Sequence, residues 1–574
     1  MSFYNVIFST KAGDISVGAP DGASLLEAAR KAGLVLESPC NGAGSCGKCR
    51  VRAFAERIQN LERKPSRHRI SAEDAAKGWT LACQTLVHGD ARVEMSEAAL
   101  HEKLEILAEG NALDVPLKPW ITKRFNATLG VTDVLAGNRA IASEDGDTTR
   151  ASYGLGIDIG TTTLVVALVD LNTGRELGAT SALNPQARHA QDVLSRISMG
   201  SDAEGLKTLH RVLTDELNRL IGELTEKLSI PRERIYEAVY AGNTTMITLA
   251  VGKNPQSLGK YPYKVEVEAP AHYNAAKVGL NIAPQGLVWL PPVISAYVGA
   301  DLTAGLLATR LDKLPGTTLL VDVGTNGEMI LAVDGKLAAT STAAGPAFEG
   351  MNIASGMRAS RGAIERVSLD DGVDYKTIGN AAPIGLCGSG VLDAIGALAA
   401  HGIIDRNGRF ASPDSEVGRR WPRNLRPEDG RPTFHIAGSV VVTQRDVRQV
   451  QLAKGAVRAG IELMLRSVGV RAENVDRVLI AGSFGYHLKT RSLLRLGMLP
   501  PGFGDRVEFV GNTSKSGAVA FLLNRDTREE VTRIVKSVNA LELANAPDFQ
   551  PTFVASLSFP EPDAEHKTAS YITQ

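Results

Sequence analysis

Hydrophobic and polar residues alternate near the start of the chain in a way that predicts a small α+β domain. Residues 4–10 (YNVIFST) and 14–20 (DISVGAP) alternate on either side of Ala12-Gly13, which is typical of a β-hairpin. Residues 23–33 (ASLLEAARKAG) have helical spacing and end at a glycine. Residues 48–54 and 91–95 predict further strands. We therefore expect a small α+β domain over residues 1–96.

The pattern weakens between residues 97 and 152. A short helix is expected over 97–110 (EAALHEKLEILAEG), followed by the polar stretch SEDGDTTR. We interpret this region as a linker with a shortened middle element. From residue 153 onward, strand and helix patterns return and continue to the end of the chain, where 549–562 (FQPTFVASLSFPEP) predicts an extended segment that packs back.

A degenerate internal duplication follows the linker. Residues 153–174 (YGLGIDIGTTTLVVALVDLNTG) and 317–336 (TTLLVDVGTNGEMILAVDGK) both read as an apolar strand, D-x-G-T, a polar turn and a second apolar strand. An Asp at a strand end can hold hydrated Mg²⁺, and the following N–H and hydroxyl groups can surround phosphate oxygens. One such turn is common in hairpins, but two copies opposed across a cleft predict a phosphate clamp.

A long amphipathic helix is predicted over 443–469. Thr443 can cap it with Asp446 at the third helical position, and the apolar residues share one face. Further glycine turns occur at 239–246, 385–398, 475–488 and 510–523.

Composition excludes several classes of protein. The 574 residues carry 63 basic and 63 acidic side chains, so zero net charge gives no support for a nucleic-acid or membrane-surface partner. No apolar run is long enough to span a bilayer, and MSFYNVIFST does not resemble a secretory signal. The five cysteines are expected to be reduced thiols in the cytoplasm, used for chemistry.

Four of these cysteines form a ligand pattern. Cys40, Cys46, Cys49 and Cys83 follow the spacing C-x5-C-x2-C-x33-C, with small residues between the first three. Three ligands on one tight loop and a distant fourth favour a [2Fe–2S] cluster. Zinc is the competing interpretation, although zinc sites usually show paired knuckles; two disulfides are the third. The pattern resembles plant-type and, by its first gap, adrenodoxin-type ferredoxins, which implies a ferredoxin-like β-grasp [2Fe–2S] domain over residues 1–96. Cys387 is expected to be a small packed residue.

Three motifs extend the resemblance. GIDIGTTT, VDVGTNGEM and VLIAGSFGYHL resemble the phosphate-1, phosphate-2 and adenosine motifs of the ASKHA superfamily, which implies a two-lobed α/β ATPase over residues 153–574. A [2Fe–2S] domain fused to such an ATPase resembles the reductive activators of corrinoid-dependent methyltransferases. NPQARHAQDVLSRI (184–197), AGNTTM and GNTSKSGA resemble that family as well.

The resemblance implies an ATP-hydrolysing activator that transfers one electron to an inactive Co(II) corrinoid and restores Co(I). It implies a corrinoid protein or methyltransferase as partner, an upstream electron donor, and a homodimer. It does not reveal which methyltransferase is served. The alternatives are an ATP-dependent activator of another metalloenzyme, a small-molecule kinase with a regulatory cluster, and an electron-transfer adaptor with a vestigial nucleotide site.

Residue roles follow from the same resemblance. Asp158 and Asp322 would position Mg²⁺ and the attacking water. Lys454 would reach the nucleotide or be solvated, and Asp192 with Arg196 would form a helix salt bridge. Phosphate contacts would come from Gly160, Thr161, Thr162, Gly324, Thr325 and Asn326, and adenosine contacts from Gly482, Ser483 and Gly485.

Overall fold

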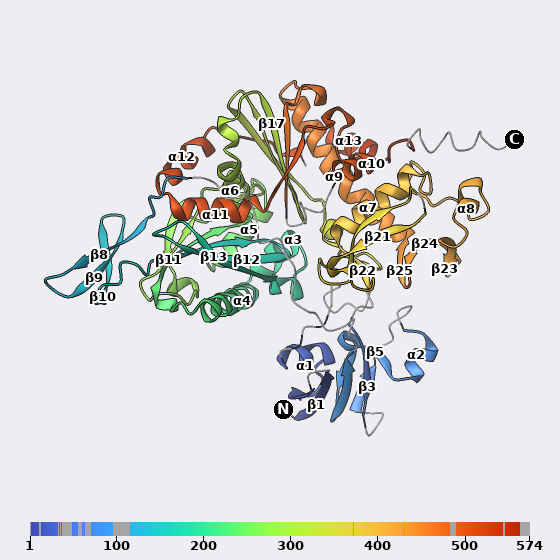
Figure 1. The fold of residues 1–574 in the computed structure, drawn as a ribbon, viewed down its shortest axis with the longest axis horizontal. Helices are drawn as coiled ribbons and strands as arrows, with labels where there is room; N and C mark the ends of the chain where they lie inside the picture. Colours follow the sequence, from blue (N-terminus) through green and yellow to red (C-terminus); the bar gives the residue numbers. More distant parts are fainter. Residues whose placement is uncertain are drawn as a thin grey trace.

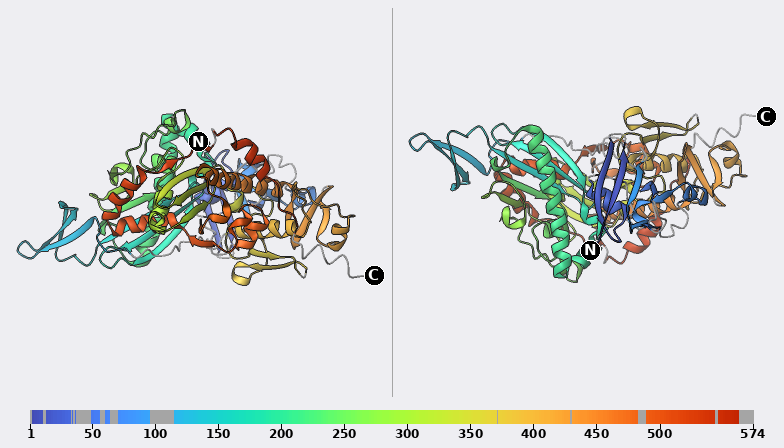
Figure 2. Two further views of the ribbon diagram at one scale, coloured as in Figure 1. Left: turned by 90° about the horizontal axis from the view of Figure 1, so that it is seen from above. Right: turned by 90° about the horizontal axis from the view of Figure 1, so that it is seen from below.

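A small N-terminal domain lies at one side of a much larger two-lobed part (Figure 1). The computed structural model describes residues 2–10, 13–32, 34, 36, 49–55, 60–63, 70–95, 115–370, 372–428, 430–482, 489–543 and 546–562. Figure 2 shows from two further sides that a narrow arm projects from one end of the large part. Among these residues, none of the helices combines the length and apolar character that crossing a membrane requires.

The N-terminal domain is a five-stranded sheet with one helix packed on it. The predicted hairpin is confirmed, with Val6 opposite Val17, and β1 pairs in parallel with the last strand, Phe8 opposite Val93. Val6, Phe8 and Val93 are fully buried against the helix. The sheet order is β2-β1-β7-β3-β5, formed by β1 (Phe3–Thr10), β2 (Gly13–Pro20), β3 (Arg50–Phe54), β5 (Trp79–Leu81) and β7 (Ala91–Met95), with α1 (Leu25–Lys31) and α2 (Ala72–Ala76).

The expected linker region contains the projecting arm. It is a three-stranded antiparallel sheet in the order β10-β9-β8, made of β8 (Ile121–Asn126), β9 (Val131–Ala136) and β10 (Arg139–Asp145). The helix expected over 97–110 lies outside the described residues. The arm is attached to the large part just before β8, where the Lys118 N–H donates to the Leu523 carbonyl at 2.8 Å.

The two lobes are built on the same sheet topology, which confirms the internal duplication. In each, the central strand pairs antiparallel with the next strand and parallel with a later one. The first sheet has the order β13-β12-β11-β14-β16-β15, from β11 (Tyr153–Ile159), β12 (Thr163–Asp170), β13 (Glu176–Leu183), β14 (Ile235–Ala241), β15 (Ala271–Asn274) and β16 (Leu287–Leu290). The second has the order β27-β26-β17-β18-β19-β28, from β17 (Thr317–Val323), β18 (Gly327–Val333), β19 (Lys336–Thr342), β26 (Arg477–Ala481), β27 (Val507–Gly511) and β28 (Asn539–Ala540).

Two equivalent helices join the lobes. α6 (Ala300–Thr309) follows β16, and α11 (Thr513–Leu523) follows β27; the two pack closely on each other. A Cβ on Gly517 would lie 2.0 Å from the carbonyl oxygen of Ala304, so only glycine permits this approach. A Cβ on Gly156 would lie 2.7 Å from Val519, so the glycines of Y-G-L-G-I-D let α11 lie directly on β11. The second lobe thereby contributes a helix to the first.

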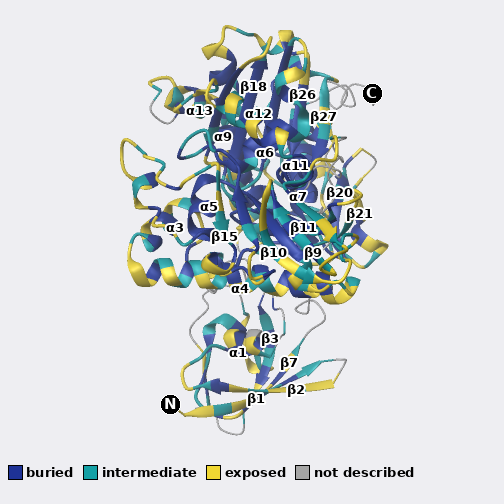
Figure 3. Cartoon of the chain, turned by 90° about the vertical axis from the view of Figure 1, so that its left-hand side faces the viewer, coloured by how far each residue is buried: buried dark blue, intermediate teal, exposed yellow. Residues whose placement is uncertain are grey.

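Long amphipathic helices cover the outer faces of the sheets. α4 (Ala203–Leu228) is capped by Asp202 and buries a leucine stripe, whereas its other side is exposed (Figure 3). α9 (Gln444–Ser467) confirms the predicted helix, including the capping box between Thr443 and Asp446. Shorter helices in the lobes are α3 (Val193–Gly200), α5 (Thr244–Ala250), α10 (Thr490–Arg495) and α12 (Asp526–Val535).

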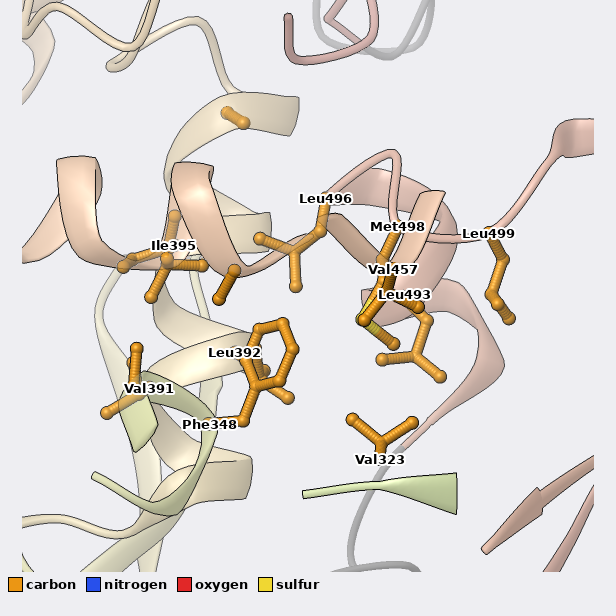
Figure 4. Close-up of a cluster of buried hydrophobic side chains, with 14 of the residues drawn as sticks. Val323, Phe348, Val391, Leu392, Ile395, Val457, Leu493, Leu496, Met498 and Leu499 are labelled. Atoms are coloured by element: carbon orange, nitrogen blue, oxygen red, sulfur yellow. The ribbon is translucent and has the colours of Figure 1, made fainter. Parts of the chain in front are cut away.

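The second lobe carries additional structure that the duplication does not explain. α7 (Gly388–Ala400) is entirely buried and packs against β20 (Ala363–Ser368) and α10. Figure 4 shows Phe348 among Val391, Leu392 and Ile395 in this core. The small strands and helix beside it are β21 (Asp374–Thr377), β22 (Gly385–Leu386), α8 (Glu416–Arg420), β23 (Leu425–Glu428), β24 (Arg431–Ala437) and β25 (Val440–Thr443).

The prediction of an extended C-terminal segment is wrong. Residues Phe549–Ser556 form α13, which packs on α9. Phe549 and Phe553 stack on each other one turn apart, with ring centroids at 6.1 Å. Proline at the third helical position is tolerated because the first-turn N–H groups have no partner within the helix.

Candidate functional site

The two predicted aspartates lie at equivalent places in the two lobes. Asp158 is the penultimate residue of β11 and pairs with Ala241 of β14, whereas Asp322 is the penultimate residue of β17 and pairs with Ala481 of β26. Both line one cleft between the lobes. Other residues that line this cleft are Gly160, Thr161, Thr162, Thr163, Asn243, Asp301, Gly324, Thr325, Asn326, Glu328, Glu349, Gly482, Asn512 and Ser514.

The two aspartates differ in their partners. Asp158 accepts hydrogen bonds from Asn512 Nδ2 at 2.9 Å and from Ser514 Oγ at 2.7 Å. Burial raises its pKa, and these two bonds oppose the rise. For Asp322, burial together with the charges of nearby carboxyls raises the pKa to about 8. The start of α11 therefore holds the first aspartate, while the second lies among like charges.

Two further acidic residues complete a buried carboxyl cluster, and sequence reasoning missed both. Asp301 is in the first turn of α6, and Glu328 lies on β18 six residues after Asp322. Burial raises the pKa of Asp301 to about 7 and that of Glu328 well above its ordinary value. Among the described residues, no three acidic, histidine or cysteine side chains are close enough together to form a preformed metal site. The T-N-G-E sequence was the available signal for Glu328.

The two predicted phosphate loops, residues 158–163 and 322–327, close on each other. Gly160 N–H donates to the Thr163 carbonyl at 2.9 Å, and Gly324 N–H donates to the Asn326 carbonyl at 3.0 Å, so each loop is a tight turn. A Cβ on Gly160 would lie 2.6 Å from that carbonyl oxygen. Across the cleft, the hydroxyl oxygens of Thr162 and Thr325 are 2.7 Å apart. The duplicated D-x-G-T turns are therefore opposed, as the clamp hypothesis predicts.

A buried arginine fixes the first of these loops from behind. Arg196 is fully buried, and its Nη2 donates to the Thr161 carbonyl at 2.7 Å. Burial lowers its pKa to about 9. Asn184 Nδ2 donates to the Gly160 carbonyl at 2.8 Å, and Asn243 Nδ2 donates to Thr161 Oγ1 at 3.0 Å. The 184–197 motif thus supports the phosphate loop.

The predicted salt bridge between Asp192 and Arg196 is replaced by other contacts. Asp192 is the N-cap of α3 and accepts from the Ser195 N–H at 2.8 Å. Arg196 instead turns inward, where Nε donates to the Ala190 carbonyl at 3.1 Å and Nη1 to Gln186 Oε1 at 3.2 Å. A capping residue is directed at the backbone of the first turn, which leaves it poorly placed to reach a side chain further along.

Two equivalent glycines follow the parallel strands on either side of the cleft. A Cβ on Gly242 would lie 2.6 Å from the Ile159 carbonyl oxygen, and one on Gly482 would lie 2.5 Å from the Val323 carbonyl oxygen. Gly482 also has φ of 127°, a conformation that favours glycine. It lines the cleft, as expected of an adenosine contact. Ser483 and Gly485 lie outside the described residues.

The structure places Lys454 away from the nucleotide cleft, which corrects both expectations for it. Its side chain is fully buried in α9, and Nζ donates to the carbonyls of Ser556, at 2.8 Å, and Ser558, at 2.5 Å. Nζ also lies 4.9 Å from the ring centre of Phe559. The reason is that α13 and the residues after it cover this face of α9, where the sequence predicted an extended segment.

Two of the four N-terminal cysteines are described, and they lie together. Cys49 precedes β3 and is fully buried, and Cys83 lies in a short turn after β5. The Cys83 N–H donates to the Cys49 sulfur at 3.5 Å, and Gln84 Nε2 donates to the Cys83 sulfur at 3.6 Å. N–H groups directed at sulfur atoms fit thiolate ligands of an iron–sulfur cluster. Cys40 and Cys46 lie outside the described residues.

Cys387 has a different environment. It is 3% exposed, packs with Met357, Ala363 and Ile378, and its Sγ donates to the Ile364 carbonyl at 3.3 Å. Burial raises the pKa of its thiol. The interpretation as a small packed residue is confirmed.

Comparison with family models agrees with this arrangement. Residues 10–88 match the 2Fe-2S iron-sulfur cluster binding domain, residues 153–314 match the RACo middle region, and residues 316–570 match the C-terminal, ASKHA domain of RACo. The middle-region model thus falls on the first lobe, not on the arm.

Individual relatives extend over most of the chain. The corrinoid activation enzyme RamQ of Eubacterium limosum is 34% identical, with 74% of each chain covered. The [Co(II) methylated amine-specific corrinoid protein] reductase of Methanosarcina barkeri is 25% identical over 71% of this chain and 77% of that one. A solved reductive activator for corrinoid, iron-sulfur protein matches 99% of this chain and 100% of its own at 31% identity, with a TM-score of 0.71. The chain belongs to the RACo family of reductive activators, in which a [2Fe–2S] ferredoxin domain precedes an ASKHA domain.

Proposed function

We propose that the chain is an ATP-dependent reductive activator, which transfers one electron from an N-terminal [2Fe–2S] cluster to the Co(II) corrinoid of a partner and restores Co(I). The observation that carries the proposal is the opposed pair of D-x-G-T turns, with the Thr162 and Thr325 hydroxyls in contact, in a chain whose N-terminal domain brings two cysteine sulfurs together. The names of the relatives support the choice of a corrinoid partner.

The N-terminal domain supplies the electron-transfer function. Cys40, Cys46, Cys49 and Cys83 would hold the cluster, which supplies a one-electron carrier of low potential when bound. The buried Cys49 and the N–H groups of Cys83 and Gln84 would stabilise negative charge on the sulfurs.

The cleft supplies the nucleotide function. Gly160, Thr161 and Thr162 from one lobe, and Gly324, Thr325 and Asn326 from the other, would contact phosphate oxygens, with Gly482, Ser483 and Gly485 near adenosine. Asp158 and Asp322 would position Mg²⁺ and the attacking water, and the charges of Asp301 and Asp322 act on each other and on Glu328. A divalent cation would lower the raised pKa values of these carboxyls.

Nucleotide hydrolysis would drive an electron transfer that is otherwise unfavourable. Ferredoxin clusters of this kind have reduction potentials of about −400 mV, and the reduction potential of a corrinoid Co(II)/Co(I) couple is lower still. For one electron, each ~59 mV uphill reduces the equilibrium constant tenfold. A lobe movement that changes affinity for one redox state of the partner can shift this equilibrium. The glycine-dependent contact between α6 and α11 is the place where the lobes would pivot.

Several finer points belong to the same proposal. The chain would act in the cytoplasm on a corrinoid protein or corrinoid-dependent methyltransferase, receive electrons from an upstream donor, and form a homodimer. Its functional units would be residues 1–96, the linker region 97–152 with its three-stranded arm, and residues 153–574.

The test combines metal analysis with reconstitution. Protein produced anaerobically with ample iron is expected to be red-brown, to contain about two irons, and to convert Co(II) to Co(I) in a corrinoid protein only with ATP and a reductant. Asp158→Ala and Asp322→Ala should each remove the ATP effect and leave the iron content unchanged. Full cobalt reduction by these variants would contradict the assignment of the cleft, and zinc in place of iron would contradict the assignment of the cysteines.

A further inference from the structure

Glu349 lies at the nucleotide cleft on a rigidly held turn. It ends the short 3₁₀ turn Pro346–Glu349, between Gly345 and Gly350, which both have positive φ, 80° and 74°. The preceding Phe348 is fully buried, and Figure 4 shows it inserted among Val391, Leu392 and Ile395. Anchoring of Phe348 in the core directs the next side chain at the phosphate loops.

The Glu349 carboxylate contacts one predicted phosphate loop directly and the other through a threonine hydroxyl. Thr325 Oγ1 donates to Glu349 Oε2 at 2.9 Å. The hydroxyl oxygens of Thr325 and Thr162 are 2.7 Å apart. Each hydroxyl carries one proton, so with the Thr325 proton directed at the carboxylate, Thr162 donates to Thr325 Oγ1. The carboxylate therefore ends a chain of hydrogen bonds that joins two loops 163 positions apart in the sequence.

The surroundings of Glu349 resemble those of a bound phosphate. Its carboxylate accepts from the Thr325 hydroxyl of the clamp. Burial raises its pKa, and the nearby threonine hydroxyls and the cations Arg358 and Arg196 oppose the rise. The cleft has a volume of about 80 Å³, room for a few waters. A triphosphate needs more space than this between the loops, as well as the hydroxyl groups that Glu349 occupies.

We propose that Glu349 is a further residue of the nucleotide site, whose carboxylate occupies the Thr325 hydroxyl, and through it the Thr162 hydroxyl, in the nucleotide-free chain and is displaced by the terminal phosphate. The inference rests on the proposed function, because it takes ATP as the ligand of this cleft. Phosphate and carboxylate compete for the same donors, and their negative charges repel each other. The affinity for nucleotide is then lower than it would be without Glu349, because part of the binding free energy is used to break the contact between Glu349 and the loops.

The experiment measures nucleotide binding in the full, cluster-loaded chain. Binding of a Mg²⁺ complex of a non-hydrolysable ATP analogue is compared by calorimetry among wild type, Glu349→Ala and Glu349→Gln. Glu349→Ala should bind about tenfold tighter, equivalent to about 1.4 kcal/mol, and Glu349→Gln, which keeps the volume without the charge, should fall between it and wild type. Glu226→Gln, an exposed glutamate of α4, is the matched control and should not change affinity.

Hydrogen exchange supplies a second readout that needs no nucleotide. Amides of residues 158–163 and 322–327 should exchange faster in nucleotide-free Glu349→Ala than in wild type, because the carboxylate no longer joins the loops. Weaker or unchanged analogue binding by both Glu349 variants, with normal thermal unfolding, would overturn the proposal, and so would unchanged exchange. Absence of binding in wild type and in every variant would instead overturn the nucleotide assignment itself, while the exchange result would still report on the bridge.

Discussion

Arg196 Nη2 donates a hydrogen bond to the carbonyl oxygen of Thr161 at 2.7 Å, across 35 positions of sequence. The guanidinium is completely buried and uses its other nitrogens on Ala190 and Gln186. A planar group with several fixed donors can satisfy three acceptors in different directions, which an ammonium cannot. The loop that contains Thr161 is therefore held from the protein interior.

Replacing this arginine by lysine should loosen the loop. In Arg196→Lys, the acceptors that the guanidinium satisfied lose donors inside the protein, so we expect the free energy of unfolding to fall by about 2–4 kcal/mol. Nucleotide affinity should fall at least about tenfold, because the Thr161 backbone is no longer fixed. Chemical denaturation and calorimetry measure the two effects. Arg211→Lys, on the exposed side of α4, is the control; equal behaviour of the two variants would contradict the role given to Arg196.

The contact between α6 and α11 allows the same substitution to be compared at two equivalent positions. Gly305 and Gly517 occupy equivalent positions in V-G-A-D-L-T-A-G and V-G-N-T-S-K-S-G. A Cβ at 517 would lie 2.0 Å from backbone, whereas at 305 the nearest atom is Thr513 Oγ1 at 3.1 Å. Gly517→Ala should therefore destabilise the protein by about 1–3 kcal/mol through overpacking.

At the equivalent position of α6 the balance is different. In Gly305→Ala, the gain in helix propensity, up to about 1 kcal/mol, opposes a milder crowding, so little net change is expected. Urea denaturation of both variants tests the comparison, and a larger loss for Gly305→Ala would show that the α6–α11 contact differs from the one described.

The buried Lys454 predicts a pH effect on stability. Burial lowers its pKa to about 7 in the folded chain, from an ordinary value of 10.5. Between these pH values the unfolded chain binds the proton and the folded chain releases it, so this residue makes stability rise with pH from about 7 to 10. In Lys454→Met this rise should be smaller, as measured by denaturation midpoints at several pH values.

The same variant tests the position of Lys454. Nucleotide affinity should stay within about twofold of wild type, because the ammonium contacts the C-terminal segment and not the cleft. Lys253→Met, an exposed lysine, should leave the pH dependence unchanged. A large loss of nucleotide binding in Lys454→Met would show that Lys454 does contact the nucleotide, as its position in the sequence suggested.

A buried ion pair joins α12 to the first sheet. Arg528 donates from both Nη atoms to the Glu237 carboxylate, at 2.8 and 3.0 Å, and its guanidinium lies 4.6 Å from the Trp289 ring centre. Removal of one partner leaves the other charge buried, so Arg528→Met should cost about 3–5 kcal/mol of unfolding free energy. Arg533→Met, exposed on the same helix, should cost little. Similar denaturation curves for the two variants would show that the pair does not hold α12.

The sequence by itself determined the elements whose pattern is local. The alternation of apolar and polar residues predicted the N-terminal hairpin. Helical spacing and a capping box predicted α9, and the repeated D-x-G-T strands predicted two lobes of equal topology. These features depend on residues a few positions apart or on direct repetition, so they can be recognised without a structure. The spacing of the cysteines and the positions of Asp158 and Asp322 belong to the same class.

Only the tertiary structure decided which distant residues share the cleft. Asp301 comes from a helix and Glu349 from a 3₁₀ turn, and no local pattern marks them as lining one cleft with Thr162. Nor does any local pattern show that Arg196, from another helix, donates to the Thr161 carbonyl. The sequence position of Lys454 on a capped helix likewise gave no sign that α13 and the segment after it would cover it. The physical reason is that packing of one element on another depends on where both faces find complementary surfaces, a property of the whole chain and not of any window within it.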